Sequence, residues 1–190
     1  MGISIIGLML VVGVVLLGVL LVIWGISVYN RLIKERELVR NAMGQIAAQI
    51  ESRWDALKSL IEATRQYAGH EADTFKSVTE ARSRVTSQST VADIEQDNQL
   101  FGRAMANINA VAEAYPDLKA SSVYQQSMGA VDKYENQVRQ SRMVYNDTVT
   151  KYNRTIQQVP SNIIAGLFNF SQERYFENSP EKAETPSWNV

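Results

Sequence analysis

The chain begins with a long apolar run, and its first charged side chain is Arg31. From Ile3 to Ile26 the residues are Ile, Leu, Val, Met, Gly or Trp, with Ser4 as the polar exception. About 20 apolar residues in a helix cross the hydrocarbon core of a bilayer, where the backbone must satisfy its own hydrogen bonds. We expect residues 1–28 to form a transmembrane helix. The run is too long for a signal peptide, so we expect the helix to be retained.

Basic residues follow this run directly, at Arg31, Lys34, Arg36 and Arg40. Positively charged flanks of membrane helices stay on the cytoplasmic side. We therefore expect a single-pass protein of the inner (plasma) membrane, with its N-terminus outside and its C-terminal domain in the cytosol.

The composition excludes several classes of function. The chain has 19 basic and 20 acidic residues, a balance that gives no support for nucleic-acid binding. It has no Cys, which removes disulfides and thiolate metal sites. We expect no nucleic-acid partner, no metal and no cofactor.

Apolar residues recur with helical spacing after the membrane segment. From Val39 onward each step is three or four residues, about 3.6 residues per turn, which predicts one buried face on a nearly straight helix from about residue 29 to 68. Gly69 stands where a C-terminal cap would lie. The residues of this stripe are Leu32, Val39, Met43, Ile46, Ile50, Trp54, Leu57, Ile61, Thr64 and Ala68.

Two further helical stretches are predicted, over about 70–115 and 121–159. The first has a polar, β-branched middle at 86–91, so we expect a break there, with Asp93 as the cap of the resumed helix. Its apolar face is expected at Leu100, Ala104, Ile108, Val111 and Ala112. Pro116 and Asp117 are expected to form a turn. In the last stretch Val131, Val138, Tyr145, Tyr152 and Val159 recur every seven residues, which is typical of coiled coils.

These stretches predict an all-α fold. We expect the N-terminal transmembrane helix to continue into an elongated antiparallel up-and-down bundle of three long helices plus a short C-terminal helix, over residues 29–177. Residues 178–190 are expected to be a disordered tail. If the break at 86–91 is a collinear kink, which we favour, Pro160 lies at the far end of the bundle. If the break is a hairpin, residues 160–177 return towards the membrane, where this apolar segment could touch lipid.

Motifs for catalysis are weak. His70-Glu71 lacks the second His that a zinc-protease helix needs, because Thr74 stands four residues later. Carboxylates such as Asp55, Glu62 and Glu113 are expected on a solvated helix face.

A repeat of Tyr-Asn stands at 145–146 and at 152–153. We expect both Tyr rings to fill the core. The Asn side chains either bond across helices or face water. Gly18 and Gly25 could allow close helix contact in the bilayer.

The chain resembles the LemA family of bacterial membrane proteins over most of its length. The resemblance rests on segments such as Arg53-Trp-Asp-Ala-Leu57, Val111-Ala-Glu-Ala-Tyr-Pro-Asp-Leu-Lys-Ala-Ser121, Arg142-Met-Val-Tyr-Asn-Asp-Thr-Val149 and Pro160-Ser-Asn-Ile-Ile-Ala165. Lys58-Ser59 replaces the family's usual Pro-Asn, which implies a straighter first helix. The resemblance implies a cytosolic helical bundle without an established biochemical activity. Candidate interaction or structural residues are Asn30, Asp55, Glu62, Tyr67, His70, Glu71, Glu113, Tyr145, Asn146, Tyr152 and Asn153.

We therefore hypothesise a membrane-anchored, non-enzymatic scaffold or adaptor of the bacterial cell envelope. Its expected partners are the lipid bilayer, further copies of the chain as a homo-oligomer, and another membrane protein, and its role would be to organise or remodel the membrane. The alternative is a small-molecule sensor or an enzyme that uses the His70-Glu71 turn.

Overall fold

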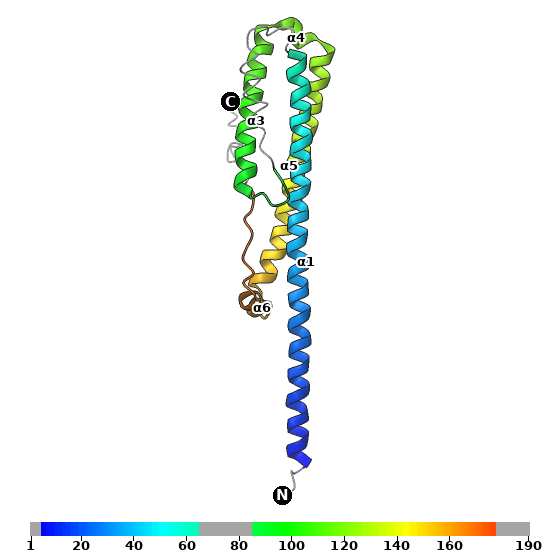
Figure 1. Cartoon of the computed structure of the whole chain (residues 1–190), viewed down its shortest axis with the longest axis vertical. Coiled ribbons are helices and arrows are strands. Elements are labelled where there is room, and N and C mark those ends of the chain that lie inside the picture. The colour runs from blue at the N-terminus through cyan, green and yellow to red at the C-terminus, as the bar shows by residue number, and fades with distance from the viewer. Residues whose placement is uncertain (1–4, 65–84, 178–190) are drawn as a thin grey trace, which may run out of the picture. The chain divides into compact units, whose positions relative to one another are not determined.

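The computed structural model describes residues 5–64 and 85–177, and every regular element in these ranges is a helix (Figure 1). The expectation of an all-α fold is confirmed. The elements are α1 (Ile5–Thr64), α3 (Val91–Ala114), α4 (Pro116–Ala120), α5 (Ser122–Gln157) and α6 (Ser161–Leu167). The contacts divide the chain into two compact units. The first comprises Met1–Val39 and Thr148–Glu173, and the second comprises Arg40–Asp147 and Arg174–Val190.

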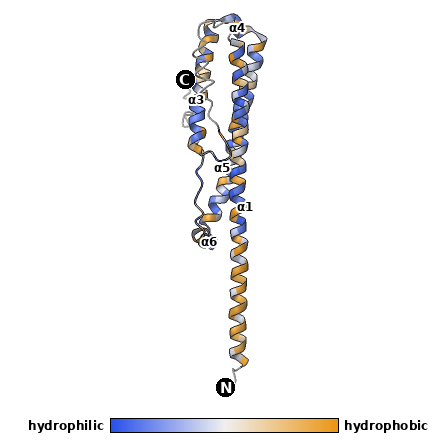
Figure 2. Cartoon of the chain, in the orientation of Figure 1, coloured by the Kyte–Doolittle hydropathy of each residue, from blue (hydrophilic) through white to orange (hydrophobic). Residues whose placement is uncertain are grey.

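Helix α1 is continuous over 60 residues and changes its character along its length. Its N-terminal part is long and apolar enough to cross a membrane, and the large apolar side chains there are exposed. Figure 2 shows this part apolar on all sides, whereas apolar and polar residues alternate further along. An all-round apolar surface suits lipid, and a one-sided stripe suits a protein core.

The predicted stripe of α1 is buried at every described position from Leu32 to Thr64. Ala68 and Gly69, the last position of the stripe and its expected cap, lie outside the described residues. The helix passes through Lys58 and Ser59 without interruption, as expected from the absence of Pro there.

In the second unit α3 runs parallel to α1, so the collinear kink that we favoured is wrong. Ser87 Cβ lies 3.3 Å from the position of a β-carbon on Gly44, and Asp97 bonds Arg53 further along both helices. A collinear second helix would run antiparallel to α1. The break itself is confirmed, since residues 85–90 are not helical.

The start of α3 is fixed by a capping box. Thr90 is the N-cap, and its hydroxyl accepts from the Asp93 backbone N–H, while the Asp93 carboxylate accepts from the Thr90 N–H at 2.7 Å. Asp93 is therefore the third helical residue rather than the cap, because the Thr90 hydroxyl accepts from a free N–H of the first helical turn and the Asp93 side chain bonds back to Thr90. These hydrogen bonds to Thr90 lower the pKa of Asp93.

Two other local predictions need correction. Pro116 begins the short helix α4 instead of a turn, because Pro is well suited to the first helical position. On α3 the buried aromatic residue is Phe101, and Leu100 beside it is only half-buried.

Helix α5 buries its seven-residue repeat at Val131, Val138, Tyr145 and Tyr152. Val159 lies beyond the end of the helix and is exposed, so the predicted face ends one repeat early. In the first unit α5 runs antiparallel to α1, since Arg31 lies beside Thr155 while Leu38 and Thr148 line one cavity.

The short helix α6 packs beside α1 in the first unit, at the end of the apolar run (Figure 1). The Phe168 and Tyr29 ring centroids are 4.7 Å apart. Pro160 is therefore close to the apolar run of α1, and its expected place at the far end of the bundle is wrong. The return of the chain towards this run follows the hairpin alternative.

Candidate functional site

The C-terminal end of α6 is closed by a Schellman motif that turns the chain sharply. The Phe170 N–H donates to the Ala165 carbonyl at 2.9 Å, and the Asn169 N–H donates to the Gly166 carbonyl at 3.3 Å. Asn169 adopts a positive φ of 56°, a region that Asn tolerates better than most residues. Phe170 and Ala165 occupy the two positions that commonly make an apolar contact in this motif, and both are buried.

Tyr29 is the centre of an aromatic cluster that this turn assembles. Its ring lies 4.7 Å from Phe168 and 5.8 Å from Phe170, measured between centroids. The Arg36 guanidinium stands 5.1 Å from the centre of the Phe170 ring, within range of a cation–π interaction. Aromatic packing around Tyr29 therefore connects α1 to the end of α6, two residues before Arg31, the first charged residue of α1.

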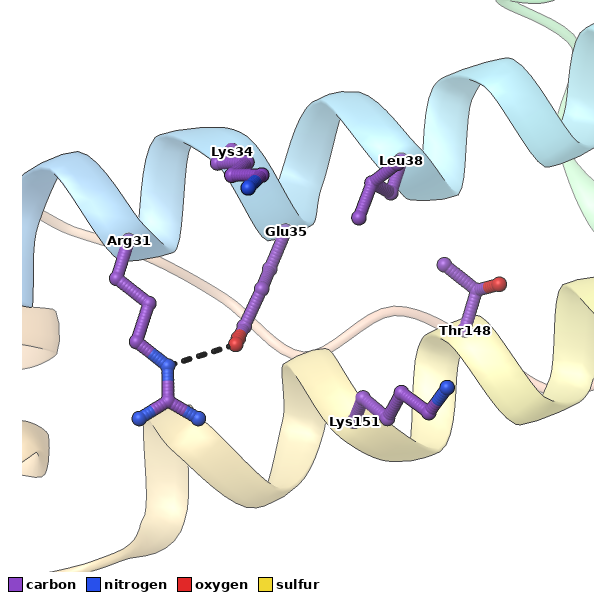
Figure 3. Close-up of a pocket in the computed structure, with 6 residues that line it drawn as sticks. All are labelled: Arg31, Lys34, Glu35, Leu38, Thr148 and Lys151. Carbon is purple, nitrogen blue, oxygen red and sulfur yellow. Dashed lines mark hydrogen bonds and ion pairs between the residues drawn. The ribbon is translucent and has the colours of Figure 1, made fainter.

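A cavity of about 310 Å³ lies between α1 and α5 in the first unit (Figure 3). Arg31 Nε and Glu35 Oε1 are 2.8 Å apart, and Arg31 Nη2 donates to Thr155 Oγ1 at 3.3 Å. Three cationic side chains and one carboxylate line the cavity, so its electrostatic potential suits an anionic group. The lining residues are Arg31, Lys34, Glu35, Leu38, Thr148 and Lys151.

The two Asn residues of the Tyr-Asn repeat bind the backbone of the extended segment 171–177. In the first unit, Asn153 Nδ2 donates to the Glu173 carbonyl and Asn153 Oδ1 accepts from the Glu173 N–H, both at 2.9 Å. In the second unit, Asn146 makes the same pair of bonds with Phe176, also at 2.9 Å. Both earlier expectations for these side chains, bonding across helices and facing water, are wrong.

The spacing of the repeat explains this pairing. Seven residues of helix rise about 10.5 Å, while the three residues from Glu173 to Phe176 span about 10 Å when extended. An Asn side chain carries one donor group and one acceptor group, as a backbone peptide does. Each Asn amide can therefore form, with one residue of the segment, the two hydrogen bonds that a neighbouring β-strand would form. Two Asn residues seven positions apart on a helix can therefore each bond one of two residues that are three positions apart in an extended segment.

The Tyr rings of the repeat are buried as predicted, and they support the same segment. Tyr145 Oη donates to the Arg174 carbonyl at 3.2 Å, and its ring lies 5.0 Å from that of Phe176. Burial raises the pKa of Tyr152, and the Glu173 carboxylate raises it further, so this phenol stays neutral.

A buried ion pair crosses the core of the second unit. Arg53 and Asp97 are 1% and 0% exposed, and Arg53 Nη2 lies 2.6 Å from Asp97 Oδ2. The Trp54 indole N–H donates to Asp97 Oδ1 at 2.9 Å, while Arg53 Nη1 contacts Glu135 Oε2 at 2.8 Å. The Phe101 ring covers the guanidinium at 4.1 Å. One Arg side chain thereby connects α1 with α3 and α5.

Arg142 extends this cluster on α5. Burial lowers the pKa of Arg142, and the positive charge of Arg53 lowers it further. Its guanidinium lies 5.1 Å from the centre of the Phe176 ring, which also contacts Tyr145. Arg142 thus senses the charges of the buried cluster and contacts the aromatic ring of Phe176 in the extended segment.

Four of the remaining candidates lie within the described residues. Asn30, Asp55, Glu62 and Glu113 are exposed on their helices. Tyr67, His70 and Glu71 lie outside the described residues. Within residues 5–64 and 85–177 no group of three His, Asp or Glu side chains could hold a metal ion.

Sequence reasoning missed the roles of Arg53 and Asp97. A signal was present, because Asp97 stands between Ile94 and Phe101 at positions where helical spacing predicts a buried residue. A charge at a buried position implies a buried partner of opposite charge.

Replacing Arg53 tests the ion pair. We expect Arg53→Met to lower the free energy of unfolding by about 3–5 kcal/mol, because the buried Asp97 carboxylate loses its guanidinium partner. The matched control is Arg139→Met at an exposed position, which should change the free energy of unfolding by less than about 0.5 kcal/mol. The measurement is urea unfolding of the full chain in detergent, followed by circular dichroism. Equal losses of unfolding free energy in Arg53→Met and Arg139→Met would contradict a stabilising Arg53–Asp97 ion pair.

The Asn residues allow a reciprocal experiment. Asn153→Ala should speed hydrogen exchange of the Glu173 amide, and Asn146→Ala that of the Phe176 amide, because each loses two side-chain-to-backbone hydrogen bonds worth about 1–3 kcal/mol together. Each variant is the control for the other. Exchange that is unchanged, or that rises equally at both amides in both variants, would show that the Asn side chains do not hold the segment.

The sequence is similar to those of known proteins. The LemA family model matches residues 42–189. The chain is 25% identical over 152 residues to protein LemA of Metamycoplasma hominis, covering 79% of this chain and 69% of that protein. It is 30% identical over 86 residues to magnetosome protein MamQ 2 of Paramagnetospirillum magneticum, covering 45% of this chain and 31% of that protein. This chain therefore spans under a third of the length of the magnetosome relatives, and it belongs to the LemA family.

Proposed function

We propose that this protein is a membrane-anchored, non-enzymatic scaffold or adaptor of the bacterial cell envelope. The observation that carries the proposal is the continuity of α1 from Ile5 to Thr64. One helix holds both an all-round apolar stretch of membrane-spanning length and the stripe that is buried in the helical domain. Anchor and domain therefore share a single secondary-structure element.

The charge pattern supports the orientation with the N-terminus outside. Arg31, Lys34, Arg36 and Arg40 follow the apolar run on α1, and positive flanks favour the cytoplasmic side. Trp24 and Tyr29 bracket the end of the run, where aromatic side chains are favoured at the membrane–water interface. We therefore propose that the helical domain lies in the cytosol, next to the inner membrane.

Assembly is the activity that we propose for this domain. Met143 and Val144 on α5 are apolar and more than half exposed, so they offer a surface for a second copy or for another membrane protein. Confinement to a membrane raises the effective concentration of such partners. The names of the relatives, protein LemA and magnetosome protein, are not enzyme names, which supports a non-enzymatic role. The sensor or enzyme alternative rests on His70 and Glu71, which lie outside the described residues.

Sizing of the full-length protein tests the proposal. After extraction in mild detergent, we expect native mass spectrometry to detect a discrete assembly, either of several copies or of one copy with a second membrane protein. Met143→Glu with Val144→Glu should weaken the assembly, because a charged group would be buried at the interface. The matched control is Asp132→Glu with Lys133→Arg, which keeps the charge of exposed α5 residues. A chain that is monomeric and without partner at its native concentration would overturn the scaffold role.

A further inference from the structure

The segment around α6 exposes a concentrated set of apolar side chains. Residues 159–170 contain no charged residue. Four of their large apolar side chains are more than half exposed, and Ile163 and Leu167 stand one helical turn apart on the same side of α6. The exposed fractions are 79% for Val159, 64% for Ile163, 70% for Leu167 and 53% for Phe168.

The α6 segment contacts α1 at two positions that are about one helical turn of α1 apart. Ile164 Cδ1 lies 3.5 Å from the position that a β-carbon on Gly25 would occupy, and Phe168 packs against Tyr29. Gly25 and Tyr29 are four residues apart, which is about 6 Å along the helix axis. The level of α6 along α1 is therefore narrowly defined within the first unit.

That level coincides with the end of the apolar run. The 22 residues from Ile5 to Ile26 are about 33 Å long as a helix, close to the roughly 30 Å of a bilayer's hydrocarbon core. Gly25 then lies in the last turn within the hydrocarbon, and Arg31 in the region of the headgroups. A segment that contacts both Gly25 and Tyr29 lies where hydrocarbon gives way to headgroups.

We propose that α6 is an interfacial helix whose exposed apolar side chains insert into the cytoplasmic leaflet of the bilayer. The occupant of this apolar surface is lipid, because the surface is continuous with the lipid-facing part of α1. The inference rests on the proposed anchoring of α1. It adds a second membrane contact, and the Schellman turn together with the Asn153–Glu173 bonds holds that contact in place.

The basic cavity fits this arrangement. Arg31 and Lys34 lie five and eight residues beyond Ile26 on α1, so their charges stand near the headgroup region while α6 reaches the acyl boundary. An interfacial helix usually carries its own basic face. Here α6 has none, and neighbouring helices supply the positive charge.

Depth-dependent quenching tests the proposal, and the absence of native Cys allows single labels. The full-length variant Leu167→Cys would carry an environment-sensitive fluorophore in bilayers of phosphatidylcholine and phosphatidylglycerol. Leu17→Cys, in the apolar run, reports whether α1 spans the bilayer. Glu37→Cys is the exposed control in the same unit, since Glu37 lies on α1 about 17 Å beyond Ile26 and does not line the cavity.

We expect lipids spin-labelled near the headgroup to quench the label at 167, and lipids labelled deep in the chain to quench the label at 17. The label at 37 should lose little fluorescence with either lipid. If the label at 17 is quenched and the label at 167 behaves like the label at 37, α6 does not touch lipid although α1 still spans the bilayer. A label at 167 in an apolar environment that lipid cannot quench would indicate a covering protein copy and would equally overturn the proposal. If 17 is not quenched, both the anchor and the α6 contact are wrong.

Discussion

A backbone hydrogen bond cannot be left unmade in the hydrocarbon of a bilayer, so the apolar run of this chain must be helical. The helix does not end where the run ends. Leu32 begins a buried stripe only six residues after Ile26, and the backbone stays helical to Thr64. The change from an all-round apolar surface to a one-sided stripe occurs without a cap, a Gly-rich joint or a Pro. The other elements of the first unit depend on this continuity, because α6 and the aromatic cluster pack on the turn where the surface changes.

Several buried polar side chains in the described residues bind backbone groups or neutralise a buried charge. Asn153 and Asn146 each hydrogen-bond the backbone of one residue of an extended segment, as a neighbouring β-strand would do. Arg53 and Asp97 are buried together, and in some proteins such a pairing contributes to a unique structure more than to net stability. An Arg with several fixed acceptors permits few alternative registers of α1 against α3 and α5. A domain with a fixed register of its helices is compatible with the scaffold role that we propose.

The sequence predicted the elements better than their partners. Periodicity reports which face of a helix is buried, so the stripe of α1 and the Tyr positions of α5 were predictable. It does not report what covers that face, and the parallel course of α3 was therefore missed. The segment 171–177 has no periodic pattern, and its binding to Asn153 depends on a match between helical and extended rise. Arg53 and Asp97 could have been paired from their buried positions, but the choice of Glu135 as a third member needed coordinates.

One uninterrupted helix joins the apolar run to the buried stripe of α1. Its continuity can be tested by hydrogen exchange of the full-length protein in lipid bilayers, resolved to single amides between Trp24 and Arg40. We expect slow exchange at every amide across this range, because each N–H donates to the carbonyl four residues earlier. A cluster of fast-exchanging amides around Tyr29 would show a flexible joint there, and α1 would then not be a single continuous helix.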